Sequence, residues 1–367
     1  MLRLASLAVF SLVVIGGALA ARSGETPVLP ATHYDYEGIE LPSYLNVSTT
    51  LKWDTTPADN PISDAGATLG RVLFYDVRLS QNKTVSCASC HHQDRGFAAP
   101  ERLSPGFQGE PTARNSMALA FPRYDRNRQF FWDERAQTLE DLALEPIQDP
   151  VEMGMTLGEL TDRLEATAFY PDLFADAFGT PEVTSDRIAR ALAQFLRSIV
   201  ASNSRYDVAR QGQGGPHGQP MAGLTDQENQ GLELFFGPGR CVQCHDGDLF
   251  MGKQPTSNGL DTTVTDRGAG NGRFKIVSLR NVALTAPYMH DGRFETLDEV
   301  VQHYSTGIQS SPGLDIRLRG RDVQPVRLNF SAAERAALVA FLNTLTDPSL
   351  ATDPRWANPF TAQATKD

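Results

Sequence analysis

A short cysteine motif occurs twice in this chain of 367 residues. Residues 87–91 read CASCH and residues 241–245 read CVQCH, so both follow the pattern Cys-x-x-Cys-His. The two motifs contain all four cysteines of the chain, and four thiols are too few to act as a disulfide scaffold over this length. The chain must therefore be held together by a hydrophobic core, and its hydrophobic content of 41% is sufficient for one.

The spacing within the motif predicts covalently attached haem. Two thiols three positions apart can each bond to a vinyl group of one porphyrin, and the histidine that follows can then bind its iron. A shared zinc site, two redox-active disulfides or structural disulfides would also account for the cysteines, but none of them requires a histidine after both pairs. We therefore expect two c-type haems, one held by Cys87, Cys90 and His91 and the other by Cys241, Cys244 and His245.

The first twenty residues predict export. Arg3 precedes an apolar run, and small residues lead up to Ala21, as they do at a signal-peptide cleavage site. An uncleaved membrane anchor is the alternative, but the apolar run is short for a bilayer span and ends at two glycines. We therefore expect residues 1–20 to be a signal peptide and the mature protein to be periplasmic, without a membrane span.

The charge balance excludes one class of partner. The chain has 33 Lys and Arg against 44 Asp and Glu, a formal net charge of −11. Nucleic-acid binding depends on clustered basic residues, so we expect no nucleic-acid partner.

Helix signals dominate the remainder of the chain. Four Ser or Thr residues are each followed three positions later by a Glu, the pattern of a helix N-cap: Thr156 with Glu159, Thr225 with Glu228, Thr296 with Glu299, and Ser331 with Glu334. Apolar residues at helical spacing follow them, whereas strand signals are few and short. The sequence therefore predicts a mainly α fold.

A Gly- and Pro-rich stretch at residues 211–223 divides the helical segments into two halves, each with one cysteine motif. This pattern predicts two cytochrome c-like haem domains packed against each other. We expect an irregular N-terminal arm at 21–66, a first haem domain at 67–212, a second at 213–350 and a C-terminal tail at 351–367.

Several longer stretches carry a family resemblance. They are LGRVLFYDVRLS (69–80), RNS (114–116), FWDERAQTLEDLALEPIQDPVEMG (131–154), LRNVALTAPYMHDGRFETLDEVV (279–301) and the two haem motifs. Through them the chain resembles the bacterial di-haem cytochrome c peroxidase and MauG family over nearly all of its mature length. The resemblance implies that the first haem reacts with H₂O₂ and that the second transfers electrons.

The resemblance also implies roles for residues outside the haem motifs. Glu152 matches the acid/base above the first haem, although without the flanking match it would read as a solvated loop carboxylate. Trp132 matches a residue between the haems that assists electron transfer; an ordinary buried aromatic is the alternative. Asn115, Thr285 and Pro287 match residues that bind a Ca²⁺ between the haems, two of them through the backbone carbonyls that such a hard cation prefers.

One departure from the peroxidases concerns the first haem. Many of them carry a histidine shortly after the first haem motif that blocks the iron until the enzyme is reduced. The corresponding loop here, LSPGFQG (103–109), has Phe107 and no histidine. The first haem is therefore predicted to be open at rest.

A second departure concerns the sixth ligand of the other haem. Within residues 296–307, Leu297, Val300 and Tyr304 share one helical face, and Tyr304 aligns with the family's axial ligand, a Met in peroxidases and a Tyr in MauG. We predict that Tyr304 binds the second iron; Met289 is the rival ligand, and a core aromatic role for Tyr304 is the alternative.

Together these features favour a MauG-like oxidoreductase. In such an enzyme H₂O₂ produces a high-valent state shared by two haems, which then oxidises a partner protein, here at a Trp side chain. A cytochrome c peroxidase, which reduces H₂O₂ to water with electrons from a small cytochrome or cupredoxin, is the alternative. A two-haem electron carrier is a third possibility, but it would have no use for Glu152. The electron route is open, since Gly239 and Arg240 stand where MauG has its relay Trp.

Overall fold

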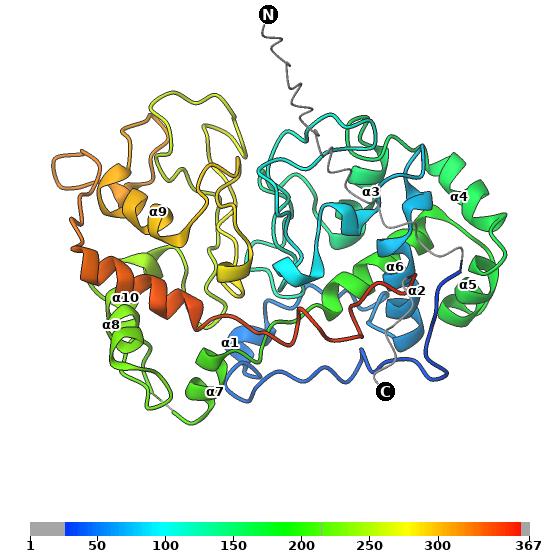
Figure 1. Ribbon diagram of the computed structural model, residues 1–367, viewed down its shortest axis with the longest axis horizontal. Coiled ribbons are helices and arrows are strands. Elements are labelled where there is room, and N and C mark those ends of the chain that lie inside the picture. Colours follow the sequence, from blue (N-terminus) through cyan, green and yellow to red (C-terminus); the bar gives the residue numbers. More distant parts are fainter. Residues whose placement is uncertain (1–25, 214, 361–367) are drawn as a thin grey trace, which may run out of the picture.

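The computed structural model describes residues 26–213 and 215–360, and the predicted signal peptide lies outside these ranges. Two helical lobes lie side by side, joined by extended segments along one edge (Figure 1). Among the described residues no helix is long and apolar enough to cross a membrane.

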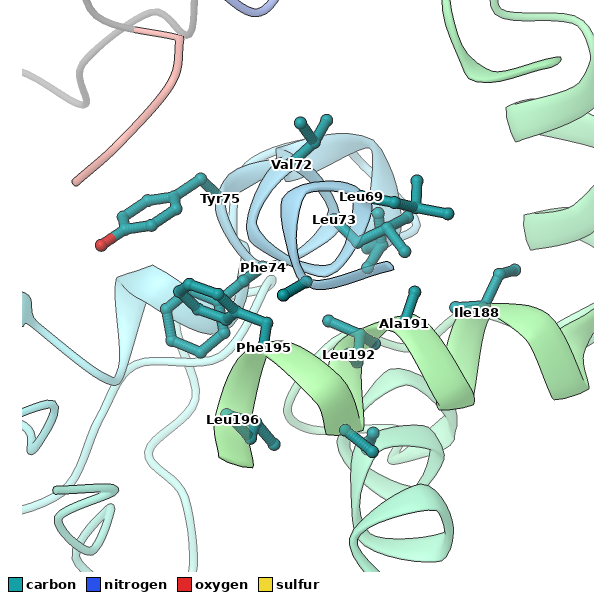
Figure 2. Close-up of a cluster of buried hydrophobic side chains, with 14 of the residues drawn as sticks. Leu69, Val72, Leu73, Phe74, Tyr75, Ile188, Ala191, Leu192, Phe195 and Leu196 are labelled. Atoms are coloured by element: carbon teal, nitrogen blue, oxygen red, sulfur yellow. The ribbon is translucent and has the colours of Figure 1, made fainter. Parts of the chain in front are cut away.

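The first lobe is built on a pair of packed helices. α2 (Asp64–Tyr75) lies against α6 (Ser185–Ser198), and Figure 2 shows the apolar side chains of the two helices interleaved. Three further helices complete the lobe: α3 (Leu139–Gln148), α4 (Leu157–Glu165) and α5 (Tyr170–Phe178). Leu69, Leu73, Ile188 and Phe195 are fully buried between them.

The second lobe repeats this arrangement with its own core. α8 (Asp226–Phe236) packs against α10 (Ala332–Asn343), with α7 (Arg205–Gln211) and α9 (Leu297–Gln302) beside them. Leu232, Phe235, Ala337 and Phe341 are buried in this core. The four N-cap pairs predicted from the sequence are confirmed, because α4, α8, α9 and α10 each begin with a reciprocal Ser/Thr–Glu capping box.

Short helical turns account for most of the remaining regular structure. The 3₁₀ turns are Val77–Leu79, Cys87–Ser89, Gln93–Arg95, Cys241–Gln243, Val282–Leu284 and Ile316–Leu318, and a π-helical turn spans His303–Gly307. The described residues form isolated β-bridges rather than strands. The predicted mainly α fold is therefore confirmed.

Both helix pairs cross so closely that only glycine fits at the crossing point. A Cβ on Gly70 of α2 would lie 2.0 Å from the carbonyl oxygen of Ala191 in α6, and a Cβ on Gly231 of α8 would lie 1.9 Å from that of Ala337 in α10. One turn further along each helix, Phe74 contacts Phe195 and Phe235 contacts Phe341, both with ring centroids 5.2 Å apart. The two lobes therefore share one packing scheme.

The chain ends connect the lobes. The arm includes α1 (Ser48–Leu51) and buries Tyr36 in the first core. After α10 the chain returns from the second lobe to the first (Figure 1), where Trp356 is buried and donates from Nε1 to Ser198 Oγ over 3.2 Å. The described part of the predicted C-terminal tail is thus packed onto the first lobe. The domain boundaries themselves stay a prediction.

A buried ion pair of the second lobe is hydrogen-bonded to the first lobe and to the arm. Arg280 of the second lobe donates to Asp207 Oδ1 over 2.8 Å and to the Ala201 carbonyl over 3.0 Å. Tyr44 of the arm donates to the same carboxylate. Arg280 holds the pKa of Asp207 below its ordinary value despite burial, which by itself would raise it. Replacing either Arg280 or Asp207 by a neutral residue would leave the other as a buried charge without its partner.

The helix crossings generate a stability prediction. Gly70→Ala and Gly231→Ala should each destabilise the folded protein by about 1–3 kcal/mol, because the added methyl meets a backbone oxygen that cannot rotate away. Gly158→Ala is the matched control: this helical glycine is exposed and has nothing within 4 Å of an added Cβ, so it should gain stability by up to about 1 kcal/mol. Denaturant unfolding measures all three, and equal stability of the three variants would contradict the packing scheme.

Candidate active site

The first cysteine motif lies on a 3₁₀ turn at the edge of the first core. Cys87–Ser89 forms the turn, and the His91 ring follows with Nδ1 at 2.9 Å from the carbonyl oxygen of Phe97. A carbonyl can only accept, so in the neutral ring Nδ1 carries the proton and Nε2 is the unprotonated nitrogen. Burial lowers the pKa of His91 to about 4, which keeps the ring neutral, as a metal ligand must be.

The second motif repeats this local geometry. Cys241–Gln243 forms the same kind of turn, and His245 Nδ1 lies 3.1 Å from the carbonyl oxygen of Phe250. Burial again lowers the histidine pKa to about 4. In each histidine, Nε2 is therefore the unprotonated nitrogen that can bind a metal, and the bond from Nδ1 to a backbone carbonyl fixes the orientation of the ring.

The second motif opens into a cavity of about 240 Å³. Apolar side chains form much of its wall, and the haem-motif residues Cys241, Cys244 and His245 line one side. Burial raises the pKa of the Cys241 thiol to about 12. Two neutral thiols and a neutral imidazole around an apolar cavity suit a covalently attached porphyrin, so these residues fit a c-type haem.

The four cysteines do not gather at one point. Within the ranges that the structure describes, no group of three or more His, Cys, Asp or Glu residues is arranged to hold a metal ion, and each cysteine pair belongs to a different lobe. This separation argues against the shared zinc site that the sequence left open.

Glu152 lies beside the first motif. Its negative charge raises the pKa of both Cys87 and Cys90, although burial is the larger cause for each thiol. Burial, and secondly the nearby carboxylate of Asp149, raises the pKa of Glu152 to about 7. A carboxyl group with this pKa can both accept and return a proton near neutral pH.

The loop that would carry a blocking histidine in many peroxidases is packed under Glu152. Phe107 donates its backbone N–H to the Glu152 carbonyl over 3.0 Å. Its ring lies against Gly154, where an added Cβ would be 2.5 Å from the ring and where φ is +63°. The buried Phe107 thus holds the segment that carries Glu152 in place.

Trp132 lies where the lobes meet. Its indole Nε1 donates to the Asn115 carbonyl over 2.8 Å, and its own carbonyl accepts from the backbone N–H of Lys275 in the second lobe over 2.8 Å. Asn115 in turn donates its backbone N–H to the His290 carbonyl over 2.8 Å. Trp132 is therefore held by backbone bonds from both lobes and lines the cavity of the second motif.

The three candidate calcium ligands share that cavity wall. Asn115, Thr285 and Pro287 all line it beside Trp132. The Asn115 side chain donates to the carbonyls of Glu101 and Arg102, both over 3.2 Å. Its side-chain oxygen is the atom of this amide that a hard cation would use.

Tyr304 and Met289, the two candidate axial ligands, also meet on this cavity wall. The amide of Asn258 joins them: its Nδ2 donates to the Tyr304 hydroxyl over 3.3 Å and to the Met289 sulfur over 3.4 Å. Burial raises the pKa of Tyr304 to about 12. Forming a phenolate there would need a cation facing the oxygen, which a ferric iron would provide.

The helix that carries Tyr304 is less regular than its sequence pattern predicts. α9 ends at Gln302, and a π-helical turn follows at His303–Gly307. His303 is not among the residues that line the cavity, but it is buried behind them, with Nε2 at 3.0 Å from the Asn258 carbonyl oxygen. Asn258 is thus bonded to the π-turn through both its backbone and its side chain.

Asn258 and the two carbonyl groups that accept a hydrogen bond from the motif histidines were not predicted from the sequence. Asn258 sits in a loop with no periodicity, so no pattern pointed to it. Phe97 and Phe250 could have been found, because each is a phenylalanine five or six positions after the motif histidine in its own half. Both adopt left-handed backbone conformations, at φ +58° and +50°, and both are fully buried.

Two haem-type cysteine motifs lie on a duplicated helical scaffold. The first has a carboxyl group beside it, and the second has a phenol beside it. These features are those of a di-haem c-type oxidoreductase. A family model described as "Di-haem cytochrome c peroxidase" matches residues 64–214. The methylamine utilization protein MauG of Methylorubrum extorquens is 32% identical over 82% of this chain and 83% of its own length. Cytochrome c551 peroxidase of Nitrosomonas europaea is 34% identical over 76% of this chain and 79% of its own.

Solved structures agree with these relatives. The crystal structure of a MauG-like protein associated with microbial copper homeostasis is 34% identical, with a TM-score of 0.74 over 88% of this chain and 99% of that one. The di-haem peroxidase BthA of Burkholderia thailandensis is 26% identical, with a TM-score of 0.64 over 80% of this chain and 89% of that one. The chain therefore belongs to the di-haem cytochrome c peroxidase and MauG family: it is a haem-dependent oxidoreductase with two c-type haems.

The separation of the two motifs generates a prediction about haem loading. Replacing both Cys241 and Cys244 by Ala should reduce the covalent haem content from two to one per chain, because the first motif keeps its own thiols and histidine. The pyridine haemochrome assay with intact-mass measurement counts the haems. A variant that still carries two covalent haems would contradict the assignment of Cys241 and Cys244 as the attachment residues.

Proposed function

We propose that this protein is a MauG-like enzyme, which uses H₂O₂ to oxidise a partner protein at an aromatic side chain, for which Trp is our candidate. The observation that carries the proposal is the position of Tyr304, whose hydroxyl faces the same cavity as His245. A phenolate oxygen stabilises oxidised iron more than a thioether does. A site with this ligand is suited to storing oxidising equivalents rather than to drawing electrons quickly from a cytochrome.

When bound, the two haems supply the redox chemistry: the first reacts with H₂O₂, and the pair holds the two oxidising equivalents. Glu152 takes the proton from the near oxygen of H₂O₂ and returns it to the departing oxygen, which leaves as water. Its raised pKa suits both transfers. The partner protein supplies two electrons, so that H₂O₂, two protons and two electrons give two waters.

Trp132 is the proposed path between the haems. It bonds to both lobes through backbone atoms, which keeps its ring at a constant position while electrons cross. A Ca²⁺ held by Asn115 and by the carbonyls of Thr285 and Pro287 would add rigidity at the same junction. The partner protein would be met in the periplasm, since residues 1–20 carry the features of a signal peptide.

A cytochrome c peroxidase is the second candidate function. One observation favours it: the Met289 sulfur lies in the same cavity and shares the Asn258 donor with Tyr304. A thioether ligand would suit rapid electron uptake from a small redox protein.

Glu152 generates a pH prediction. If the carboxylate is the base, the rate of reaction with H₂O₂ should rise with pH and reach half its maximum near pH 7, because the residue has a pKa of about 7 and must be ionised to accept the proton. Glu152→Gln should lower the rate roughly 10²–10⁴-fold. Stopped-flow absorbance of the diferric holoenzyme measures both.

Glu110→Gln is the matched control. Glu110 is an exposed carboxylate directly after the 103–109 loop, so its replacement should leave the rate unchanged. A rate that does not depend on pH, or that survives in Glu152→Gln, would exclude Glu152 as the base.

Tyr304 generates a prediction that separates the two functions. Tyr304→Phe should change the optical and EPR spectra of the second haem and shorten the lifetime of the H₂O₂-oxidised protein roughly tenfold or more, whereas Met289→Leu should change neither. The opposite pattern, with spectra that respond to Met289→Leu alone, would support the cytochrome c peroxidase.

A further inference from the structure

A cluster of arginines lies on the second lobe of this acidic protein. Residues 315–328 contain four Arg and two Asp, although the whole chain has a net charge of −11. Arg240 comes directly before the second cysteine motif and adds a fifth cation. We call this set of residues the arginine face: it consists of Arg240, Arg317, Arg319, Arg321 and Arg327, together with the apolar residues Ile316 and Val323 among them.

The arginine face adjoins the second haem cavity. Arg240 and Arg317 line the cavity itself, as do Leu318 and Val326. Arg317 donates from Nη1 to the carbonyl of Gln243 over 2.6 Å, which ties the segment to the cysteine motif. In Figure 1 the chain between α9 and α10 projects from the outer end of the second lobe, away from the first. A protein that covered this face would therefore lie next to the second haem site.

Most of the positive charge on this face is not neutralised. Arg317 pairs with Asp315 over 2.7 Å. Arg319 and Arg327 donate to backbone carbonyls, of Leu314 over 2.9 Å and of Ile308 over 2.8 Å. In the part of the chain that the structure describes, Arg317 is the one arginine of the face with a carboxylate within 4.0 Å. A neutral carbonyl does not cancel the positive charge of a guanidinium group, so these arginines can still attract an acidic partner.

Two of the most exposed large apolar side chains of the described residues lie among these arginines. Ile316 is 81% exposed and Val323 is 63% exposed. Val323 sits at φ +66° in a tight turn closed by the bond from the Gly320 N–H to the Gln324 carbonyl, over 2.7 Å. A β-branched residue is unfavourable in that conformation, so the turn presents Val323 to solvent against its local preference. Exposed apolar residues bordered by charge are typical of docking sites.

We propose that the arginine face docks the partner protein, and that the partner presents acidic residues around an apolar contact. The proposal rests on the proposed function, because it names the surface through which the second haem exchanges electrons with that partner. The net charge of −11 alone would suggest a basic partner. The positive charge of the arginine face indicates an acidic partner instead, because the electrostatic potential near the contact surface, rather than the total charge, steers the approach of two proteins.

The experiment uses the holoenzyme and two probe proteins of opposite surface charge. Zinc-substituted plastocyanin carries an acidic face and cannot be oxidised by the haems, so its binding is measured independently of any reaction with H₂O₂. Lysine-rich mitochondrial cytochrome c is the basic counterpart. At low ionic strength we expect plastocyanin to bind more tightly than cytochrome c, and its affinity to fall on the order of tenfold in Arg319→Glu/Arg321→Glu.

Two further variants test whether the loss of affinity comes from the lost charge, from disturbed folding, or from a charge change at any position on the surface. Arg321→Glu alone changes an exposed side chain that makes no hydrogen bond or ion pair within the described residues, and it should still weaken plastocyanin binding. Lys52→Glu/Arg128→Glu carries the same change in charge but lies beside Trp53, where Lys52 Nζ is 5.0 Å from the ring centroid. This control should change the affinity less than about twofold.

The proposal is overturned if the wild type prefers cytochrome c, or if the control lowers plastocyanin binding as much as the arginine-face variants do. The reaction of each variant with H₂O₂, followed without any protein partner, reports on the proposed function separately. All variants should retain it, because none of the changed residues touches the Glu152 side of the molecule.

Discussion

Each half of this protein depends on one close contact between two helix backbones. At Gly70 and at Gly231 a helix passes within van der Waals contact of a carbonyl oxygen on its partner, and an added methyl group would overlap that oxygen. The contact fixes where the phenylalanines one turn away meet. The cysteine motif that follows each glycine helix is then placed at the edge of a rigid core. Both haem sites are therefore held by the same packing, and in both the motif histidine donates from Nδ1 to a backbone carbonyl.

The function depends on where this symmetry ends. Beside the first motif is Glu152, whose carboxyl group loses solvation and has a pKa near neutrality. Beside the second are a phenol and a thioether that share one amide donor. In the proposed function, the first site moves a proton and the second provides an iron ligand that sets the stability of oxidised iron. Trp132, bonded to backbone atoms of both lobes, lies between these unequal halves.

Much of this arrangement could be predicted from the sequence, and the exceptions have physical causes. The cysteine motifs and the capping boxes are local patterns. The motifs therefore predict the haem attachment residues, and the capping boxes correctly predicted the starts of four helices. The repeat G-x-x-x-F in α2 and α8, and A-x-x-x-F in α6 and α10, was also visible in the sequence. It had no meaning until the structure showed that the two pairs cross. The π-turn after α9 and the position of Asn258 depend on contacts between distant segments, which no periodicity reports.

If one scaffold holds two unequal haems, EPR of the resting holoenzyme should distinguish them. At low temperature the diferric protein should give two signals of equal intensity. One should be high-spin, from the haem beside Glu152 with an open face, and the other low-spin, from a haem with ligands on both faces. Two low-spin signals would show that the two haems are alike in ligation, because neither iron would then be free to react with H₂O₂.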